Sequence, residues 1–469
     1  MSKTEVTHTQ PKTHARKRMS ATYVDQLSDA RSMQQNDQPN QTINQDLTQE
    51  ATFAWPFVIY QLAICMPIFI YVGASRVAPY KIILLLAFLP CVIKVIMSKQ
   101  TSLKLGDALI VGYTAISVLS IINSPLTEST LEPILSTVLE TSGSYFLARA
   151  FVNSSSAFKI LIRTQLLLVM IVGLFSVYEA VSGTNILFKF YGAAFQTFAI
   201  SDMPQRLGLH RAQGTFEHPI LYGVYSSLIF GLCFYGLKTC HTNFQRYWRL
   251  TLVLLATFVS LSTGAYISIV GQLAFIAWDK YITFTKHRWR LLIALSILAY
   301  FVVDGLSNRT PFEVFITYLT FDTNSAYNRI LIWTYGIAEV WRNPLLGKGL
   351  FIEWIRPVWM IASIDNFFLL RAMRHGIIAV LLLIGLIVWV ITKLSNLKIE
   401  LQLIRDYRTG FLVTIGGLCI SLITVDLWSG LYSYFFFLLG SSVWMIDRSK
   451  GLSNTDIEPA SIGITRRDS

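Results

Sequence analysis

Cysteine is scarce in this sequence, and charged residues are few for a chain of its length. The 469 residues include five cysteines, and none of them forms a Cys-x-x-Cys pair. Most of them lie inside apolar runs, so we interpret them as small apolar side chains and expect neither a disulfide framework nor a cysteine metal site. Only 14% of the residues are charged, whereas 53% are hydrophobic. This composition excludes an ordinary soluble domain and indicates a polytopic α-helical membrane protein.

Several motifs that carry chemistry are also missing. The sequence has no His-Glu-x-x-His, no Ser-His-Asp spacing, no Cys/His cluster and no Asp-x-Asp pair in a predicted outer loop, so we expect neither a metal nor a cofactor. No basic run is interleaved with aromatics, so nucleic acid is not an expected partner. The net charge of +12 is explained by the positive-inside rule and by anionic lipid headgroups. Residues 1–54 are polar throughout, so we expect no cleavable signal peptide.

What the sequence does contain is a series of apolar runs, each near the length that a hydrocarbon core requires. We count about twelve predicted spans, at residues 56–73, 79–97, 107–123, 131–151, 159–182, 219–237, 248–262, 264–279, 290–304, 376–394, 410–425 and 430–446. Between the seventh and eighth, Ser262-Thr263-Gly264 is either a tight turn or a break in one re-entrant element. The fold class expected is therefore all-α.

The distribution of charge predicts the orientation of these spans. Lys and Arg gather in alternate loops, whereas the loops 124–130 and 426–429 have neither. This pattern places both termini in the cytoplasm. We expect a disordered cytoplasmic tail over 1–54, a transmembrane domain over 55–447 and a cytoplasmic tail over 448–469.

Two predicted outer segments, residues 183–218 and 305–375, break the rule because they are rich in arginine. The larger lies between the ninth and tenth spans. Long loops translocate regardless of charge, so the orientation stands. A diphosphate or similar anion would explain the arginines, since guanidinium groups bind phosphate oxygens well. The alternatives are contact with anionic lipid or ion pairs with outer acids, namely Asp202, Asp304, Glu313, Asp322 and Glu353.

The first outer segment ends in Arg211-Ala-Gln-Gly-Thr-Phe-Glu-His-Pro219. Pro219 suits the first position of a helix, so Glu217 and His218 are predicted at a helix N-terminus beside free backbone N–H groups. With Arg211 upstream on the same loop, the stretch is a candidate site for a phosphate and for acid–base chemistry. Alternatively, His218 only caps the helix and Glu217 pairs with Arg211.

The second outer segment carries Arg329 and Trp333, which share a helix face, and then Asp365. A carboxylate among apolar residues just before a span is costly unless it is paired or functional, so Asp365 is a candidate general base. Arg371 and Arg374 follow at helical spacing as candidate diphosphate ligands. The alternative is a salt bridge from Asp365 to either arginine. The turn 343–349 lacks the spacing of a phosphate-binding loop.

Taken together, these motifs resemble the O-antigen ligase and O-antigen polymerase superfamily of bacterial envelope enzymes. The resemblance covers roughly residues 105–395. It rests on four stretches in order, namely Arg211-Ala-Gln-Gly-Thr-Phe216, the Arg329-x-x-x-Trp333 helix, Pro344-Leu-Leu-Gly-Lys-Gly349, and Ile364-Asp-Asn366 with His375-Gly-Ile377.

The resemblance implies a GT-C-like fold and a metal-independent, inverting glycosyltransferase whose donor is a glycan on undecaprenyl diphosphate. It implies that Arg211 and Arg329 bind the donor diphosphate. Asp365 stands where many ligases have the His that activates the acceptor hydroxyl, which leaves Asp365 or His218 as the base. The Glu-His-Pro and Ile-Asp-Asn versions are closer to exopolysaccharide polymerases of the inner membrane, whose site faces the periplasm.

Three functions therefore remain to be compared. The preferred one is a polymerase that joins a growing glycan to a lipid-linked repeat unit, with a flippase and a chain-length regulator as possible partners. A ligase would instead move finished glycan to a lipid or protein acceptor. A flippase for lipid-linked oligosaccharide should show internal repeats and charges in mid-span, and we find no clear repeat.

Overall fold

The computed structural model describes residues 54–72, 75–98, 103–124, 130–238, 242–285, 287–319, 323–350, 354–360, 362–399 and 401–448. Apart from Ala54 and Arg448, the two predicted tails lie outside these residues. The described chain runs through α2 (Trp55–Ile64), β1 (Ile68–Val72), β2 (Ser75–Val77), α3 (Pro79–Met97), α4 (Leu105–Ile122), α5 (Leu131–Val138), the π-helical turn η1 (Leu139–Gly143), α6 (Ser144–Phe151), α7 (Ser155–Ser182), α8 (Ile186–Gly192), β3 (Gln196–Thr197), α9 (Pro219–Ser227), α10 (Ile229–Gly236), α11 (Asn243–Phe258), α12 (Thr263–Tyr281), α13 (Arg288–Leu306), α14 (Pro311–Leu319), α15 (Thr323–Arg342), α16 (Phe367–Ser395), α17 (Gln402–Ser421), α18 (Ser429–Gly440) and α19 (Val443–Asp447).

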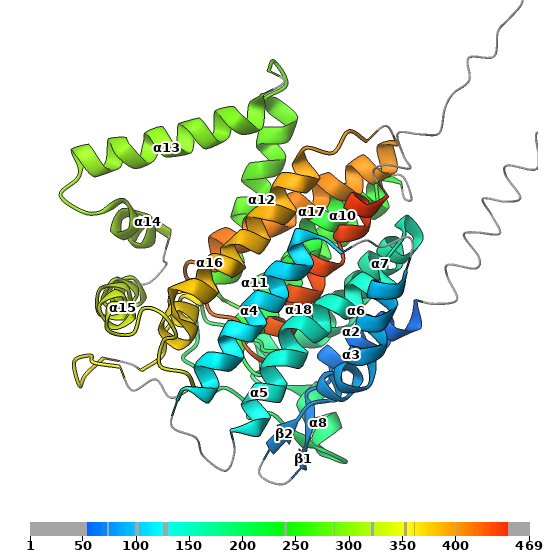
Figure 1. The fold of residues 1–469 in the computed structure, drawn as a ribbon, viewed down its shortest axis with the longest axis horizontal. Coiled ribbons are helices and arrows are strands. Elements are labelled where there is room, and N and C mark those ends of the chain that lie inside the picture. The colour runs from blue at the N-terminus through cyan, green and yellow to red at the C-terminus, as the bar shows by residue number, and fades with distance from the viewer. Residues whose placement is uncertain are drawn as a thin grey trace, which may run out of the picture. The chain divides into compact units, whose positions relative to one another are not determined.

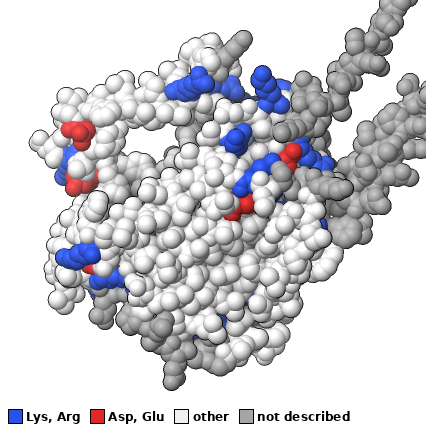
Figure 2. Space-filling view, viewed as in Figure 1, with Lys and Arg blue, Asp and Glu red and all other residues white. Residues whose placement is uncertain are grey.

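Long apolar helices dominate this order (Figure 1). Within the described residues, seven stretches are long and apolar enough to cross a membrane: Pro79–Met97, Leu105–Ile122, Ser155–Ser182, Pro219–Gly236, Arg288–Leu306, Phe367–Ser395 and Ser429–Asp447. Figure 2 shows that Lys, Arg, Asp and Glu are sparse over the helices on the face drawn. The prediction of a helical, multi-pass membrane protein is confirmed at this level.

The first predicted span, residues 56–73, is not one helix. Helix α2 has ten residues, which makes it about 15 Å long, half of a hydrocarbon core of about 30 Å. Pro67 follows and disfavours helix at Met66, and the Ile-Phe-Ile-Tyr-Val run after it suits a strand. That run is β1, which lies between β2 and β3 in an antiparallel sheet.

Two other predicted spans also differ in detail. Residues 131–151 form a helix that widens into a π turn at η1, where the Thr141 hydroxyl donates to the Thr137 carbonyl at 2.6 Å. Residues 259–262 separate α11 from α12, and Leu261 adopts φ 48° there. The break at Ser262 is therefore a turn between two helices.

Helix α16 is broken at Gly376, which has φ 82° and ψ 173°. The turn that follows α15 supplies the hydrogen bonds that the break removes. Lys348 N donates to Met373 O at 2.9 Å, Gly349 N donates to Arg374 O at 2.8 Å, and Ile377 N donates to Pro344 O at 2.7 Å. The predicted turn at 343–349 is thus confirmed, and it docks against the broken helix.

Replacing Gly376 by Ala is expected to destabilise the protein. A Cβ at Gly376 would overlap the carbonyl of Leu345, and the positive φ would add strain of about 1–3 kcal/mol. Thermal unfolding of the purified protein should show a clear fall in melting temperature. Gly305→Ala is the matched control, since no atom lies within 4 Å of the added Cβ. Equal melting temperatures for the two variants would contradict the docking of the turn.

A buried ionic cluster ties α4, α6 and α19 together. The Arg149 guanidinium donates from Nε to Asp107 Oδ1 at 3.0 Å and from Nη2 to Asp107 Oδ2 at 3.1 Å, and from Nη1 to Asp447. Tyr145 donates to Asp107 at 2.9 Å, and Lys104 pairs with Asp447 at 3.3 Å. Arg149 does not reach out to lipid headgroups, because its side chain is 1% exposed.

Candidate functional site

A cavity of about 920 Å³ lies where several helices begin or end. Its walls come from the loop before α9, the α11–α12 turn, the first turns of α15, the segment before α16, and the α17–α18 loop. All five parts contribute lining residues, among them Met203, Arg206, Arg211, His218, Ser262, Asn328, Arg329, Asp365, Arg374, Asp426 and Trp428. Residues of both predicted outer segments, 183–218 and 305–375, therefore line one cavity.

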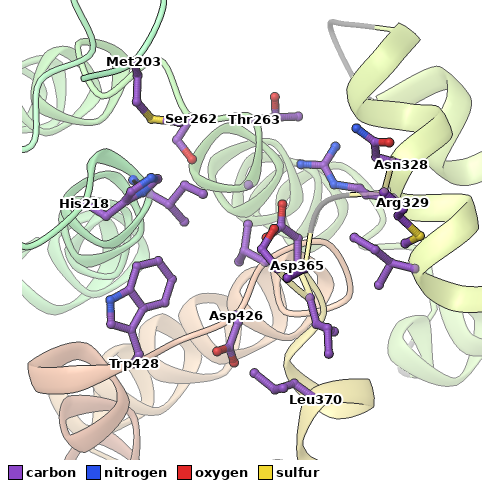
Figure 3. Close-up of a pocket in the computed structure, with 18 of the residues that line it drawn as sticks. Met203, His218, Ser262, Thr263, Asn328, Arg329, Asp365, Leu370, Asp426 and Trp428 are labelled. Carbon is purple, nitrogen blue, oxygen red and sulfur yellow. Dashed lines mark hydrogen bonds between the residues drawn. The ribbon is translucent and has the colours of Figure 1, made fainter. Parts of the chain in front are cut away.

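Positive charge predominates in this cavity. Four arginines and two aspartates line it, and one of the aspartates, Asp426, is already paired with Arg371 behind the wall at 3.2 Å. In Figure 3, Met203 and His218 lie opposite Asn328 and Arg329, and Asp365 lies between the two groups. Such a cavity suits an anionic ligand, because guanidinium groups hold phosphate or carboxylate oxygens with paired hydrogen bonds.

Arg211 is charged and lacks a carboxylate partner among the described residues. Its Nη1 contacts the Met203 sulfur at 3.1 Å, and its buried Nε has no hydrogen-bond partner there. Burial lowers the pKa of Arg211 to about 10, and the nearby charge of Arg206 adds to this effect, so the group is still protonated at neutral pH. A buried cation without a partner is costly unless a ligand supplies the missing negative charge.

The loop that carries Arg211 is held by a buried carboxylate from α7. Glu179 accepts hydrogen bonds from the backbone N–H of Gln213 at 3.1 Å and of Gly214 at 3.0 Å, and from the Asn185 side chain at 3.1 Å. Gly214 has φ 57°, a conformation that glycine adopts without strain. Glu179 therefore fixes the backbone of the turn Arg211-Ala-Gln-Gly, and Arg211 lines the cavity.

His218 caps α9, as one of the two sequence interpretations requires, and it also lines the cavity. Its Nδ1 accepts a hydrogen bond from the backbone N–H of Ile220 at 3.1 Å. Burial lowers the pKa of His218 to about 4, and the charge of Arg211 contributes. The ring is therefore neutral at pH 7, and with Nδ1 accepting, the ring proton is on Nε2. In this state Nε2–H of His218 can donate a hydrogen bond, whereas the Nδ1 lone pair is already engaged by the Ile220 N–H.

Asp365 has no hydrogen bond or ion pair to any described residue, although it lines the cavity. Burial raises the pKa of Asp365, and the charges of Arg329 and Arg211 partly offset that rise. The alternative of a salt bridge from Asp365 to Arg371 or Arg374 is wrong, because no ion pair among the described residues joins Asp365 to either arginine, and Arg371 pairs with Asp426. An unpaired carboxylate beside arginines has the properties of a general base.

The remaining predicted arginines divide into two groups. Arg329 and Arg374 line the cavity. The Arg329 Nε donates to the Thr424 carbonyl at 3.3 Å. Arg371 does not line the cavity. It pairs with Asp426, donates to the Leu427 carbonyl at 2.7 Å and stacks over the Tyr432 ring at 4.4 Å. Its place is behind the α17–α18 loop, where it supports the cavity wall.

Glu217 points away from the cavity. One carboxylate oxygen accepts from the Trp428 indole at 3.1 Å, and the other accepts from the Ser429 hydroxyl at 2.7 Å. The predicted pair between Glu217 and Arg211 does not form among the described contacts. Glu217 instead holds Trp428, whose ring lies 5.6 Å from that of His218.

Sequence reasoning did not select two charged residues that line the cavity, Arg206 and Asp426. Arg206 begins a tight turn in which its backbone exchanges two hydrogen bonds with Leu209, each 3.0 Å. The signal for this turn was the Leu207-Gly208 pair. Asp426 lies in a short loop without Lys or Arg, predicted to be outside, and only its position near a span end distinguished it in the sequence.

These observations define a multi-pass membrane protein with an arginine-lined cavity at one end of its helices. Among the described residues, no group of three or more His, Cys, Asp or Glu side chains could hold a metal ion. No protein-family model matches the chain, and a search of curated proteins finds no significant relative.

Proposed function

We propose that this chain is a membrane glycosyltransferase of the polysaccharide polymerase kind. It would transfer a glycan from undecaprenyl diphosphate to a lipid-linked repeat unit on the periplasmic side of the bacterial inner membrane. The observation that carries the proposal is the unpaired Asp365 in a cavity lined by four arginines, at the ends of apolar helices. The positive charge needed at the diphosphate comes from these arginines, so the proposed mechanism is metal-independent.

In the proposed reaction, an acceptor hydroxyl attacks the anomeric carbon of the donor sugar. Asp365 takes the hydroxyl proton, the new glycosidic bond forms, and the bond from the anomeric carbon to the diphosphate oxygen breaks. Undecaprenyl diphosphate leaves with the bonding electrons. Arg211 and Arg329 stabilise the charge that develops on it. Attack from the side opposite the diphosphate inverts the anomeric centre.

The hydrogen bond at His218 separates the two candidates for the base. Because Nδ1 of His218 is occupied by the Ile220 N–H, its Nε2–H is available to donate to a diphosphate oxygen. Asp365 accepts no hydrogen bond from a described residue and is therefore the group that can take the proton. We assign Asp365 as the base and His218 as a donor to the leaving group.

The topology that accompanies the proposal has twelve crossings and a GT-C-like arrangement. The predicted alternation of loops between the two sides of the membrane is supported by the fact that segments predicted to be outside lie together. The Ser262 turn and the Asp426 loop line the same cavity as both outer segments, and β1 pairs with β3 from residues 183–218. Predicted cytoplasmic ends lie together at the Arg149 cluster.

Arg211→Ala and Arg329→Ala are each expected to abolish most polymer. Loss of one group that stabilises the leaving charge lowers turnover by about 10²-fold or more. The measurement is polymer length in cells together with the amount of single lipid-linked repeats, at matched membrane abundance of the protein. Loss of polymer with accumulation of single repeats is expected for both variants.

Arg309→Ala is the matched control, since Arg309 is an exposed outer arginine that does not line the cavity. It should retain full polymer. If Arg211→Ala and Arg329→Ala also retain full polymer, the proposal is wrong. If long polymer forms but is not joined to its final acceptor, the protein is a ligase. If repeats accumulate only on the cytoplasmic face, it is a flippase.

A further inference from the structure

A second cavity of about 840 Å³ lies beside the first, on the side formed by α11 and α12. Its walls are almost entirely apolar and include Leu254, Leu255 and Phe258 of α11 and Ile269 and Val270 of α12. Most of these side chains are exposed on the protein, for example Val270 at 57% and Phe258 at 42%. The cavity is thus a groove open along the surface of two apolar helices. We call it the α11–α12 groove.

The groove and the arginine cavity share a boundary. Arg206 lines both of them. Across the α11–α12 turn, Leu261 lines the groove, whereas Ser262 lines the arginine cavity. Arg206 is fixed at this boundary, because its Nη1 donates to the Leu261 carbonyl at 2.9 Å. A charged compartment therefore passes directly into an apolar one, with a guanidinium at the junction.

Backbone strain is concentrated at the same boundary. Of the three described non-glycine residues with positive φ, two line the groove: Leu207 at φ 54° and Leu261 at φ 48°. This conformation is unfavourable for leucine and persists only where the surroundings impose it. Leu207, which is 80% exposed, occupies the tip of the Arg206–Leu209 turn. The strained turns keep two leucines at the groove and Arg206 beside them.

We propose that the α11–α12 groove binds the first isoprene units of the donor's polyprenyl chain, while the diphosphate lies at Arg211 and Arg329 with Arg206 beside its lipid end. This inference rests on the proposed function and assigns a separate site to the lipid part of its substrate. Its support is the continuity of the two compartments and their match to an amphiphile that has a dianionic head and an apolar chain. Burial of that chain contributes binding free energy in proportion to the apolar area covered.

The placement also distinguishes the donor from the acceptor. Arg206 and Arg211 come from the segment before α9, next to the groove, and in this proposal they hold the group that leaves together with Arg329. Asp365 stands between this side and the Arg329 side of the cavity (Figure 3). An acceptor sugar must present its hydroxyl to Asp365, so its own lipid has no place in the groove while the donor occupies it.

The test compares donors of two chain lengths on the full-length protein in nanodiscs. One donor is the repeat unit on undecaprenyl diphosphate, and the other is the same repeat unit on methyl diphosphate, which has no isoprene unit to enter the groove. Val270→Trp fills the groove from a position that is 57% exposed. It is expected to raise KM for the long-chain donor about tenfold or more, with kcat and the KM of the methyl diphosphate donor unchanged. Leu86→Trp on α3, which is 73% exposed and lines neither cavity, is the control.

If Val270→Trp affects both donors equally, or behaves as Leu86→Trp does, the groove assignment is wrong while the proposed function stands. If the unmodified protein transfers sugar from neither donor, the proposed function is wrong. In that case the groove assignment is decided by a binding measurement, namely whether nanodiscs that contain the protein retain undecaprenyl diphosphate. Retention by the unmodified protein and loss in Val270→Trp would support it, and equal retention would show ordinary membrane lipid contact only.

Discussion

Asp365→Asn is expected to lower the rate of glycan transfer by about 10²–10⁴-fold, the range that a positioned general base contributes. The amide keeps the size of the carboxylate but cannot take a proton. Arg211 and Arg329 are unaffected, so the variant should bind undecaprenyl diphosphate as tightly as the unmodified protein does. Single-turnover transfer and lipid-diphosphate binding, measured on the same preparation, separate the two effects.

The pH dependence gives a second readout of the same residue. Burial raises the pKa of Asp365, and a base works only when it is deprotonated. Activity should therefore be full above this raised pKa and fall as the pH decreases through it, at a higher pH than an ordinary aspartate would give. Asp202→Asn, a change at an exposed outer aspartate, should leave both rate and profile intact. A fully active Asp365→Asn protein, or one with the same acidic limb, would exclude Asp365 as the base.

The Arg149 cluster carries the largest stability effect we expect. Arg149→Met leaves the Asp107 carboxylate buried without its bidentate partner, and breaking a buried pair in this way costs about 3–5 kcal/mol. The folded fraction in detergent and the melting temperature should both fall. Arg163→Met on α7, an exposed arginine, is the matched control and should have little effect.

A double replacement tests the cause. Asp107→Leu together with Arg149→Met removes both charges of this pair and leaves Asp447 with its other partner, Lys104, and an apolar pair of similar size is often as stable as the ion pair it replaces. The double variant should therefore be more stable than Arg149→Met alone. If it is less stable, the loss comes from packing and not from the unpaired carboxylate.

The helical class could be predicted from the sequence because it depends on local composition, and apolar runs of about twenty residues mark spans. Which loops lie on which side of the membrane stays a prediction from the loops in which Lys and Arg gather. The end of α2 could not be predicted from hydropathy, since β1 is as apolar as a helix. Only Pro67 carried that information. The break in α16 was hidden for a similar reason, because Gly376 lies within a run that is otherwise helical.

The sequence could indicate which residues belong to the site, but not which of them contact one another. Arg211, His218, Arg329 and Asp365 line one cavity, as their positions next to spans suggested. Spacing could not show that Asp426 captures Arg371 from 55 residues away. The prediction that Glu217 belongs to the site was wrong in its position, although the local backbone conformation explains where its side chain lies. His218 has extended φ and ψ of −154° and 146°, and successive side chains of an extended chain point to opposite sides.

The hydrogen bonds between the 343–349 turn and the broken helix α16 limit how this protein can be recombined. The carbonyls of Met373 and Arg374 are satisfied by N–H groups from the preceding outer segment, so the outer segment and the membrane helix complete each other. A chimera joined between residues 350 and 367 would take the N–H groups of Lys348 and Gly349 from one chain and the carbonyls of Met373 and Arg374 from the other. Exchange of this segment between related chains would therefore have to move residues 343–377 as one block.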